Sequence, residues 1–126
     1  MHLILGGRYM GKKIYAEKLY GKFDNVYDLS IQELENVKNS GLIINLHIGI
    51  KNLLMKNINA FDFFKARIKF LRQYVITGDE ISGGIIPVDK FERQWRDETG
   101  KIYQFLANEA EIVDRVFAGL AIRLKG

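Results

Sequence analysis

Cysteine is absent from this sequence of 126 residues, which also holds only one proline and two histidines, His2 and His47. The lack of cysteine excludes a disulfide framework and any metal site built on thiolates. Two histidines are too few for a histidine-rich metal site, so we expect no metal held by these residue types. A chain without disulfides is typical of a reducing compartment, and we expect a cytoplasmic protein.

Long apolar runs are also missing. The apolar run at 3–5 meets Gly6 and Gly7 at once, which leaves it too short for a signal peptide. No stretch approaches the roughly 20 apolar residues that cross a bilayer, and we expect no membrane association. With 48% hydrophobic and 27% charged residues, the composition is that of a globular protein, and the length favours one domain spanning 1–126.

The formal net charge is +4, which favours anionic partners such as nucleotides or nucleic acid. The basic residues are spread along the chain, and those within 60–73 lie mostly opposite an apolar face made by Phe61, Phe64, Ile68 and Leu71. Aromatic rings on an apolar face cannot stack on bases, so we interpret the basic side as a solvated surface. The hypothesis that the chain is a nucleic-acid-binding module rests on charge alone and is the weakest alternative.

Short apolar runs alternate with helical patterns along the chain. We expect strands at 2–5, 26–27, 42–46 and 74–77, and a pair of strands within 112–125 that turns near Gly119. We expect helices at 12–20, after a capping box made by Ser30 and Glu33, at 60–73, and after Asp89 as N-cap. The nearly continuous apolar run at 42–46 is typical of a central strand covered on both faces. This alternation predicts an α/β fold: a P-loop NTPase-like layered sheet, mostly parallel, with an antiparallel C-terminal strand pair.

Residues 6–13 read G-G-R-Y-M-G-K-K, which spaces two glycines and a lysine as a P-loop does, between a first strand and a first helix. In such a loop, backbone N–H groups surround phosphate oxygens, the helix N-terminus adds partial positive charge, and the lysine bridges the terminal phosphates. The predicted nucleotide-binding residues of this loop are Gly6, Gly7, Arg8, Gly11, Lys12 and Lys13. Lys13 stands where a P-loop carries the Ser or Thr that ligates Mg²⁺, and a lysine cannot do so. The alternative is a glycine turn that only connects strand to helix.

Four other charged residues and one histidine are further candidates. Asp79 and Glu80 follow an apolar strand at the edge where α/β sheets bind ligands, and they complete the predicted nucleotide-binding set. The alternative for both is a solvated turn. Arg93 and Arg96 either contact phosphate or substrate, or form ion pairs on a helix surface. His47 lies beyond an apolar strand, and we interpret it as structural rather than as a nucleophile.

Three stretches of the C-terminal part carry a further pattern. They read T-G-D-E-I-S-G-G-I-I-P at 77–87, R-Q-W-R-D-E-T-G-K-I-Y-Q-F-L-A at 93–107 and V-F-A-G-L-A-I-R-L-K at 116–125. Together with the glycine loop, they resemble the adenosylcobinamide kinase/adenosylcobinamide-phosphate guanylyltransferase family of cobalamin biosynthesis. The matching positions are Glu80, Gly84, Pro87, Arg93, Arg96, Asp97, Gly100, Gln104, Leu106 and Ala107. The resemblance covers 1–20 and 75–125 and extends less closely to 41–54.

The resemblance implies ATP or GTP as the nucleotide, a corrinoid as the second ligand, and a homo-oligomer. Family members carry an acid in the strand that resembles 42–46, where this chain has Ile44. The family segment that bears the guanylyl-accepting histidine is missing here, because residues 21–41 contain no histidine. We therefore expect a shortened, motif-eroded member whose phosphotransfer is impaired or lost, with no guanylyl transfer and little role for Mg²⁺.

Two alternatives stay open. In one, the protein is a working kinase that phosphorylates adenosylcobinamide with a nucleoside triphosphate, using Lys12 as the phosphate clamp and Asp79 or Glu80 on Mg²⁺. In the other, it is a regulatory or binding relative that has lost nucleotide binding altogether.

Overall fold

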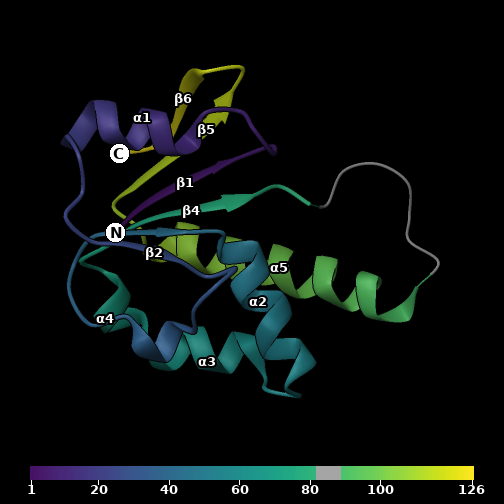
Figure 1. The fold of residues 1–126 in the computed structure, drawn as a ribbon. Helices are drawn as coiled ribbons and strands as arrows, with labels where there is room; N and C mark the ends of the chain where they lie inside the picture. Colours follow the sequence, from purple (N-terminus) through teal and green to yellow (C-terminus); the bar gives the residue numbers. More distant parts are fainter. Residues whose placement is uncertain (82–88) are drawn as a thin grey trace.

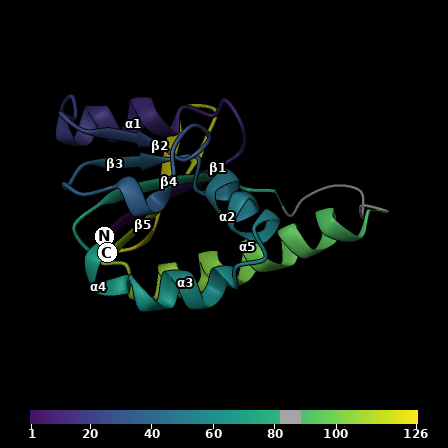
Figure 2. The same cartoon turned by 60° about the horizontal axis from the view of Figure 1, so that its bottom comes forward.

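The computed structural model describes residues 1–81 and 89–126 and has three layers, with a six-stranded sheet between helices (Figure 1). Helix α1 (Lys12–Tyr20) covers one face of the sheet (Figure 2). The helices on the other face are α2 (Leu46–Met55), α3 (Ala60–Ala66), α4 (Ile68–Leu71) and α5 (Lys90–Glu109). The layered α/β architecture predicted from the alternation of elements is confirmed.

The strand order in the sheet is β2-β3-β4-β1-β5-β6. The parallel strands are β2 (Val26–Asp28), β3 (Leu42–Ile44), β4 (Val75–Asp79), β1 (His2–Gly6) and β5 (Ile112–Phe117). The last strand, β6 (Leu120–Lys125), is antiparallel to β5, so the predicted strand directions are confirmed. Because the parallel strands share one direction, their carboxyl ends meet at one edge, where ligands bind in open α/β sheets.

Two apolar clusters hold the sheet between the helices. Leu3 and Ile4 are successive residues of β1, and both are completely buried, on opposite faces. Leu3 belongs to the cluster that contains Ile50 of α2 and Ile102 of α5, whereas Ile4 packs with Ala16 of α1. Full burial of an aliphatic side chain contributes roughly 1.5–3 kcal/mol, so β1 is anchored from both sides. This anchoring fixes the point where the glycine loop leaves the sheet.

The prediction of a helix after the capping box made by Ser30 and Glu33 is wrong. A short 3-10 turn, Leu34–Asn36, is found there instead. The Ser30 hydroxyl and N–H both donate to Asp28 Oδ1, at 2.7 and 2.9 Å, so this side chain does not cap a helix. Ile31, expected on the apolar face, is 82% exposed. A side-chain acceptor two residues earlier competes successfully with the helix start.

Two other elements differ in extent. The helix expected at 60–73 is divided into α3 and α4 at Arg67, whose φ is −106° and whose guanidinium lies over the ring of Phe63. The strand expected at 42–46 ends at Ile44, because Asn45 adopts a left-handed conformation (φ 61°, ψ 43°) and α2 begins directly after it. Strand β3 is an inner strand, but the central pair consists of β4 and β1. The central position predicted for β3 is therefore wrong by one strand.

Helix α5 and the C-terminal hairpin begin and turn as predicted. The Asp89 side chain accepts the N–H groups of Phe91 and Glu92 at 2.7 and 3.1 Å and caps α5. Gly119, with φ 77°, lies in the turn between β5 and β6. The glycines and the proline expected at 83–87 lie outside the described residues. In the two described stretches, no helix combines the length and the apolar character needed to cross a membrane.

Candidate phosphate-binding site

A cleft of ≈ 880 Å³ opens at the carboxyl edge of the sheet, between the glycine loop, the start of α2 and the end of β4. Most of the residues predicted to bind nucleotide line it: Arg8, Gly11, Lys12, Lys13, Asp79 and Glu80. Gly6 and Gly7 lead directly into this part of the loop. His47 of α2 and Trp95 of α5 also line the cleft. The structure thus brings the two ends of the predicted site together from β1 and β4.

The glycine loop turns back on itself before α1. Met10 N donates to Gly7 O at 3.3 Å, and Tyr9 (φ 60°) and Gly11 (φ 94°) both adopt left-handed conformations. The hairpin tip supports the loop, since Gly119 N donates to Met10 O at 3.0 Å. Among the described residues, no side chain caps α1, and its first turn carries no acid. The partial positive charge of the helix N-terminus is therefore not offset on its own helix.

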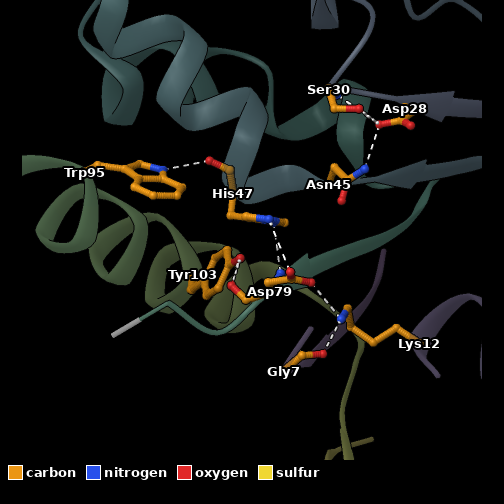
Figure 3. Close-up of polar contacts among 9 residues, drawn as sticks. All are labelled: Gly7, Lys12, Asp28, Ser30, Asn45, His47, Asp79, Trp95 and Tyr103. Carbon is orange, nitrogen blue, oxygen red and sulfur yellow. Dashed lines mark hydrogen bonds and ion pairs between the residues drawn. The ribbon is translucent and has the colours of Figure 1, made fainter. Parts of the chain in front are cut away.

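Lys12 reaches back across the loop to the end of β4. Its Nζ donates to Gly7 O at 2.8 Å and lies 2.7 Å from Asp79 Oδ1 (Figure 3). The side chains of Lys12 and Asp79 are only 10% and 16% exposed, so water and salt screen this ion pair weakly. The sheet register explains the contact, because Gly6 at the end of β1 pairs with Asp79 at the end of β4. Lys12, predicted to bind phosphate, is therefore in direct contact with Asp79, another residue of the predicted nucleotide-binding set.

His47, near the start of α2, is buried beside Asp79. Its Nδ1 accepts the Asp79 N–H at 3.1 Å, and its Nε2 lies 3.3 Å from Asp79 Oδ2. This arrangement places the ring proton on Nε2. Burial lowers the pKa of His47 and outweighs the Asp79 carboxylate, while Lys12 and Arg8 lower the pKa further. Trp95 fixes the residue by donating Nε1–H to His47 O at 2.8 Å, with its ring stacked on the imidazole.

The role of His47 was not evident from the sequence, because it depends on which strands are neighbours. Strand β3 pairs with β4, so the start of α2 meets the end of β4. Tyr103 of α5 reaches the same place, and its hydroxyl donates to Asp79 O at 2.6 Å. Burial, reinforced by the charges of Asp79 and Glu80, raises the pKa of Tyr103. Gly78 makes room for this hydroxyl, which would lie 2.4 Å from a Cβ at that position.

A second polar group at the carboxyl edge, centred on Asp28 of β2, was also missed. Asp28 Oδ1 accepts hydrogen bonds from Asn45 Nδ2 at 2.7 Å and from the Ser30 hydroxyl and N–H. Burial raises the pKa of Asp28, but these hydrogen bonds, helped by the charge of Lys13, outweigh it and leave the pKa below its usual value. The carboxylate is therefore ionised, and its hydrogen bond from Asn45 joins the end of β2 to the end of β3. The signal in the sequence was an acid at the end of a short strand.

Of the other predicted site residues, Glu80 forms an ion pair, and Arg93 and Arg96 lie along α5. Glu80 accepts from the guanidinium of Arg115 in two contacts, Nε to Oε1 at 2.7 Å and Nη2 to Oε2 at 3.0 Å. Arg93 and Arg96 line a separate depression along α5. The structure therefore does not bring the two arginines to the cleft beside the glycine loop.

Asp79 and Glu80 are the acidic residues among the described residues that line the cleft. Lys13, predicted to stand where a P-loop carries its magnesium-ligating hydroxyl, has its Nζ 4.0 Å from Glu17 Oε1 on the same helix. Ile44, at the position where the resemblance implies an acid, ends β3. Across 1–81 and 89–126, no three His, Cys, Asp or Glu side chains are grouped so that they would hold a metal ion.

The family model for cobinamide kinase/cobinamide phosphate guanyltransferase matches residues 28–124, more than half of the chain. The chain belongs to this family. The cobinamide kinase/guanyltransferase match confirms the resemblance read from the C-terminal stretches, and with it a place among the proteins of cobalamin biosynthesis. It takes in Asp28, His47 and Asp79, whereas the glycine loop at 6–13 precedes it. No curated protein sequence matches the chain.

Proposed function

We propose that this cobinamide kinase/guanyltransferase relative binds a nucleotide or another phosphate compound through residues 6–13, with transferase activity impaired or lost. The observation that carries the proposal is the placement of Lys12, with its Nζ on Gly7 O, beside the N-terminus of α1 in one cleft. Family membership favours ATP or GTP as the phosphate compound, a corrinoid as the second ligand and assembly into a homo-oligomer.

Positive charge supports binding of an anion. Arg8, Lys12 and Lys13 line the cleft, and they add to the partial charge at the N-terminus of α1. Charge-assisted hydrogen bonds to phosphate oxygens are about twice as strong as neutral ones. A phosphate held by such charges and by backbone N–H groups should bind less tightly as salt is added, and should depend little on Mg²⁺.

The missing cation ligands argue against efficient phosphoryl transfer. Such transfer needs a metal ion that bridges the phosphates and neutralises the charge that develops on them. Lys13 and Ile44 replace the hydroxyl and the acid at two independent places. A working kinase would need Asp79 or Glu80 on Mg²⁺, but Asp79 contacts Lys12 and Glu80 contacts Arg115. Binding without transfer is therefore the favoured function.

Guanylyl transfer through a covalent intermediate needs an accessible imidazole nitrogen. His47 is 6% exposed, and its two ring nitrogens face the backbone and side chain of Asp79. His2 is 4% exposed and contacts Tyr20 and Asp114 through its ring nitrogens. Both histidines of the chain are thus occupied in contacts of their own.

Calorimetric titration with ATP, GTP and pyrophosphate, each with and without Mg²⁺, tests the proposal. We expect binding that weakens with salt and changes little with Mg²⁺. Lys12→Ala should weaken it by about tenfold to hundredfold, since a hydrogen bond to a charged group contributes about 1.5–3 kcal/mol. Lys18→Ala is the matched control, because Lys18 is an exposed lysine of the same helix that does not line the cleft. If the wild-type protein binds none of the three ligands at millimolar concentration, the loop is a simple turn and the proposal fails.

A further inference from the structure

The ammonium group that would hold a phosphate is already neutralised by the chain itself. Lys12 Nζ lies 2.7 Å from Asp79 Oδ1 and 2.8 Å from Gly7 O. Both side chains of the ion pair are more than four-fifths buried, so the attraction between them is stronger than that of a surface pair. A phosphate oxygen that approached Lys12 would meet a carboxylate in the position it needs.

Asp79 is fixed in this position from several elements. Its backbone N–H donates to His47 Nδ1, its backbone oxygen accepts from the Tyr103 hydroxyl, and its Oδ2 lies beside His47 Nε2 (Figure 3). His47 is held in turn, because Trp95 donates to its backbone oxygen. The carboxylate is therefore part of a positioned network and is not a mobile side chain that happens to meet Lys12.

We propose that Asp79 is a built-in competitor for the anion of the glycine loop, so that a phosphate compound binds Lys12 only by displacing this carboxylate. The inference rests on the proposed function and goes beyond it, because in it Asp79 determines how tightly the loop binds phosphate. Asp79 also repels a bound phosphate, because both groups are negative and lie close to one ammonium. His47 acts as a positioning residue that keeps the carboxylate on Lys12.

The opposite role for Asp79 would be to hold a cation that accompanies the ligand. Removal of its charge would then weaken binding in the presence of that cation and leave magnesium-free binding unimproved. In magnesium-free buffer the two roles predict different results for one substitution: affinity increases if Asp79 competes with the anion, and it does not increase if Asp79 holds a cation. Asp79→Asn keeps the shape of the side chain, removes its charge and replaces one acceptor oxygen by an NH2 donor.

The test is calorimetric titration of inorganic pyrophosphate in magnesium-free buffer with EDTA, for the wild type and Asp79→Asn. We expect Asp79→Asn to bind about tenfold to hundredfold more tightly, since Lys12 no longer has to break a charged pair. Glu80→Gln is the matched control for a general loss of negative charge at the cleft, because the Glu80 carboxylate is paired with Arg115 and not with Lys12. Its gain in affinity should be several times smaller.

Binding that is equal or weaker in Asp79→Asn than in the wild type would overturn the inference while leaving the proposed function intact. No binding to either protein would overturn both. Binding to Asp79→Asn when the wild type shows none would support the inference, with the carboxylate acting as a complete block, and would overturn the proposed binding of phosphate by the wild-type protein. If Asp79→Asn does not melt cooperatively, Asp79→Ser takes its place, with the same expected increase in affinity and the same contradicting result.

Discussion

The Nε2 atom of His2 lies 2.6 Å from Oδ2 of Asp114, so a buried imidazole and a buried carboxylate join β1 to β5 beneath α1. Tyr20 contacts His2 Nδ1 at 2.6 Å, while Asp114 also accepts from Tyr15 at 2.7 Å and Arg123 at 2.5 Å. Burial lowers the pKa of His2 and outweighs the attraction of Asp114. Burial raises the pKa of Asp114, but its hydrogen bonds from Arg123, Tyr15 and His2 bring that pKa below the usual value.

Acidification should therefore destabilise the fold in two steps. In the unfolded chain, the pKa of a histidine is about 6.5. The stability contributed by neutral His2 is therefore complete above that pH and is lost as the pH falls through the lower pKa of His2 in the folded protein. The contribution of Asp114 is complete above about pH 3.9 and is lost as the pH falls through its own depressed pKa. We expect the free energy of unfolding, measured by urea titration, to decrease from about pH 7 to about pH 5.

His2→Gln should flatten this first step, because it removes the titrating ring. Some slope should remain, since burial also lowers the pKa of His47. The same urea titrations on the variant measure the difference. An unchanged slope in His2→Gln would show that His2 does not contribute to the pH dependence of stability.

Lys13→Ser should make nucleotide binding dependent on magnesium. The substitution restores the hydroxyl that ligates Mg²⁺ in a P-loop and removes one positive charge from the cleft. Lys13 is 53% exposed, so the free energy of unfolding should change by less than about 0.5 kcal/mol. Calorimetry should show weaker ATP binding than the wild type in EDTA and a recovery of affinity with Mg²⁺. A variant that responds to Mg²⁺ no more than the wild type would show that the other missing ligands dominate.

Guanylyl transfer should be absent. Incubation with labelled GTP, followed by denaturing electrophoresis, should give no acid-labile protein–GMP adduct, because both histidines are buried and engaged in contacts. His47→Ala provides the comparison. An adduct that forms on the wild type and disappears in this variant would make His47 the nucleophile and contradict the proposed function.

Gly6→Ala should destabilise the sheet itself. A Cβ at Gly6 would lie 2.4 Å from the backbone oxygen of Val116, so β1 and β5 would have to separate locally. Such overpacking costs about 1–3 kcal/mol, measured as a loss in the free energy of unfolding. Gly100→Ala is the matched control, because nothing lies within 4 Å of its added Cβ and α5 should gain about 1 kcal/mol from the better helix former. Equal effects of the two substitutions would contradict this explanation.

The sequence predicted the features that depend on neighbouring residues. The glycine loop before α1, the Asp89 cap of α5 and the hairpin turn at Gly119 are each determined by a few consecutive side chains. The Ser30 capping box failed for a local reason too, because Asp28 offers Ser30 a nearer acceptor than the backbone of a helix.

Features that depend on the order of the strands were not predictable in the same way. Asp79 meets Lys12 because β4 lies directly beside β1, and it meets His47 because β4 also lies beside β3. Apolar periodicity shows that a strand is buried, but it does not show which strands are its neighbours. Six of the eight residues predicted to bind nucleotide therefore line the cleft, whereas the ion pair of Lys12 with Asp79 and the contact of His47 with Asp79 were not predicted.

The support that the C-terminal hairpin gives to the glycine loop has a consequence for synthesis of the chain. The backbone N–H of Gly119 donates a hydrogen bond to Met10 O. The backbone N–H of Ala118 donates one to the Met10 sulfur, and these two residues are 108 positions apart in the sequence. Contacts this distant in sequence form late, since the intervening chain must first be closed into place. On the ribosome, the glycine loop is translated before the hairpin and obtains these supports only after residues 118 and 119 have emerged.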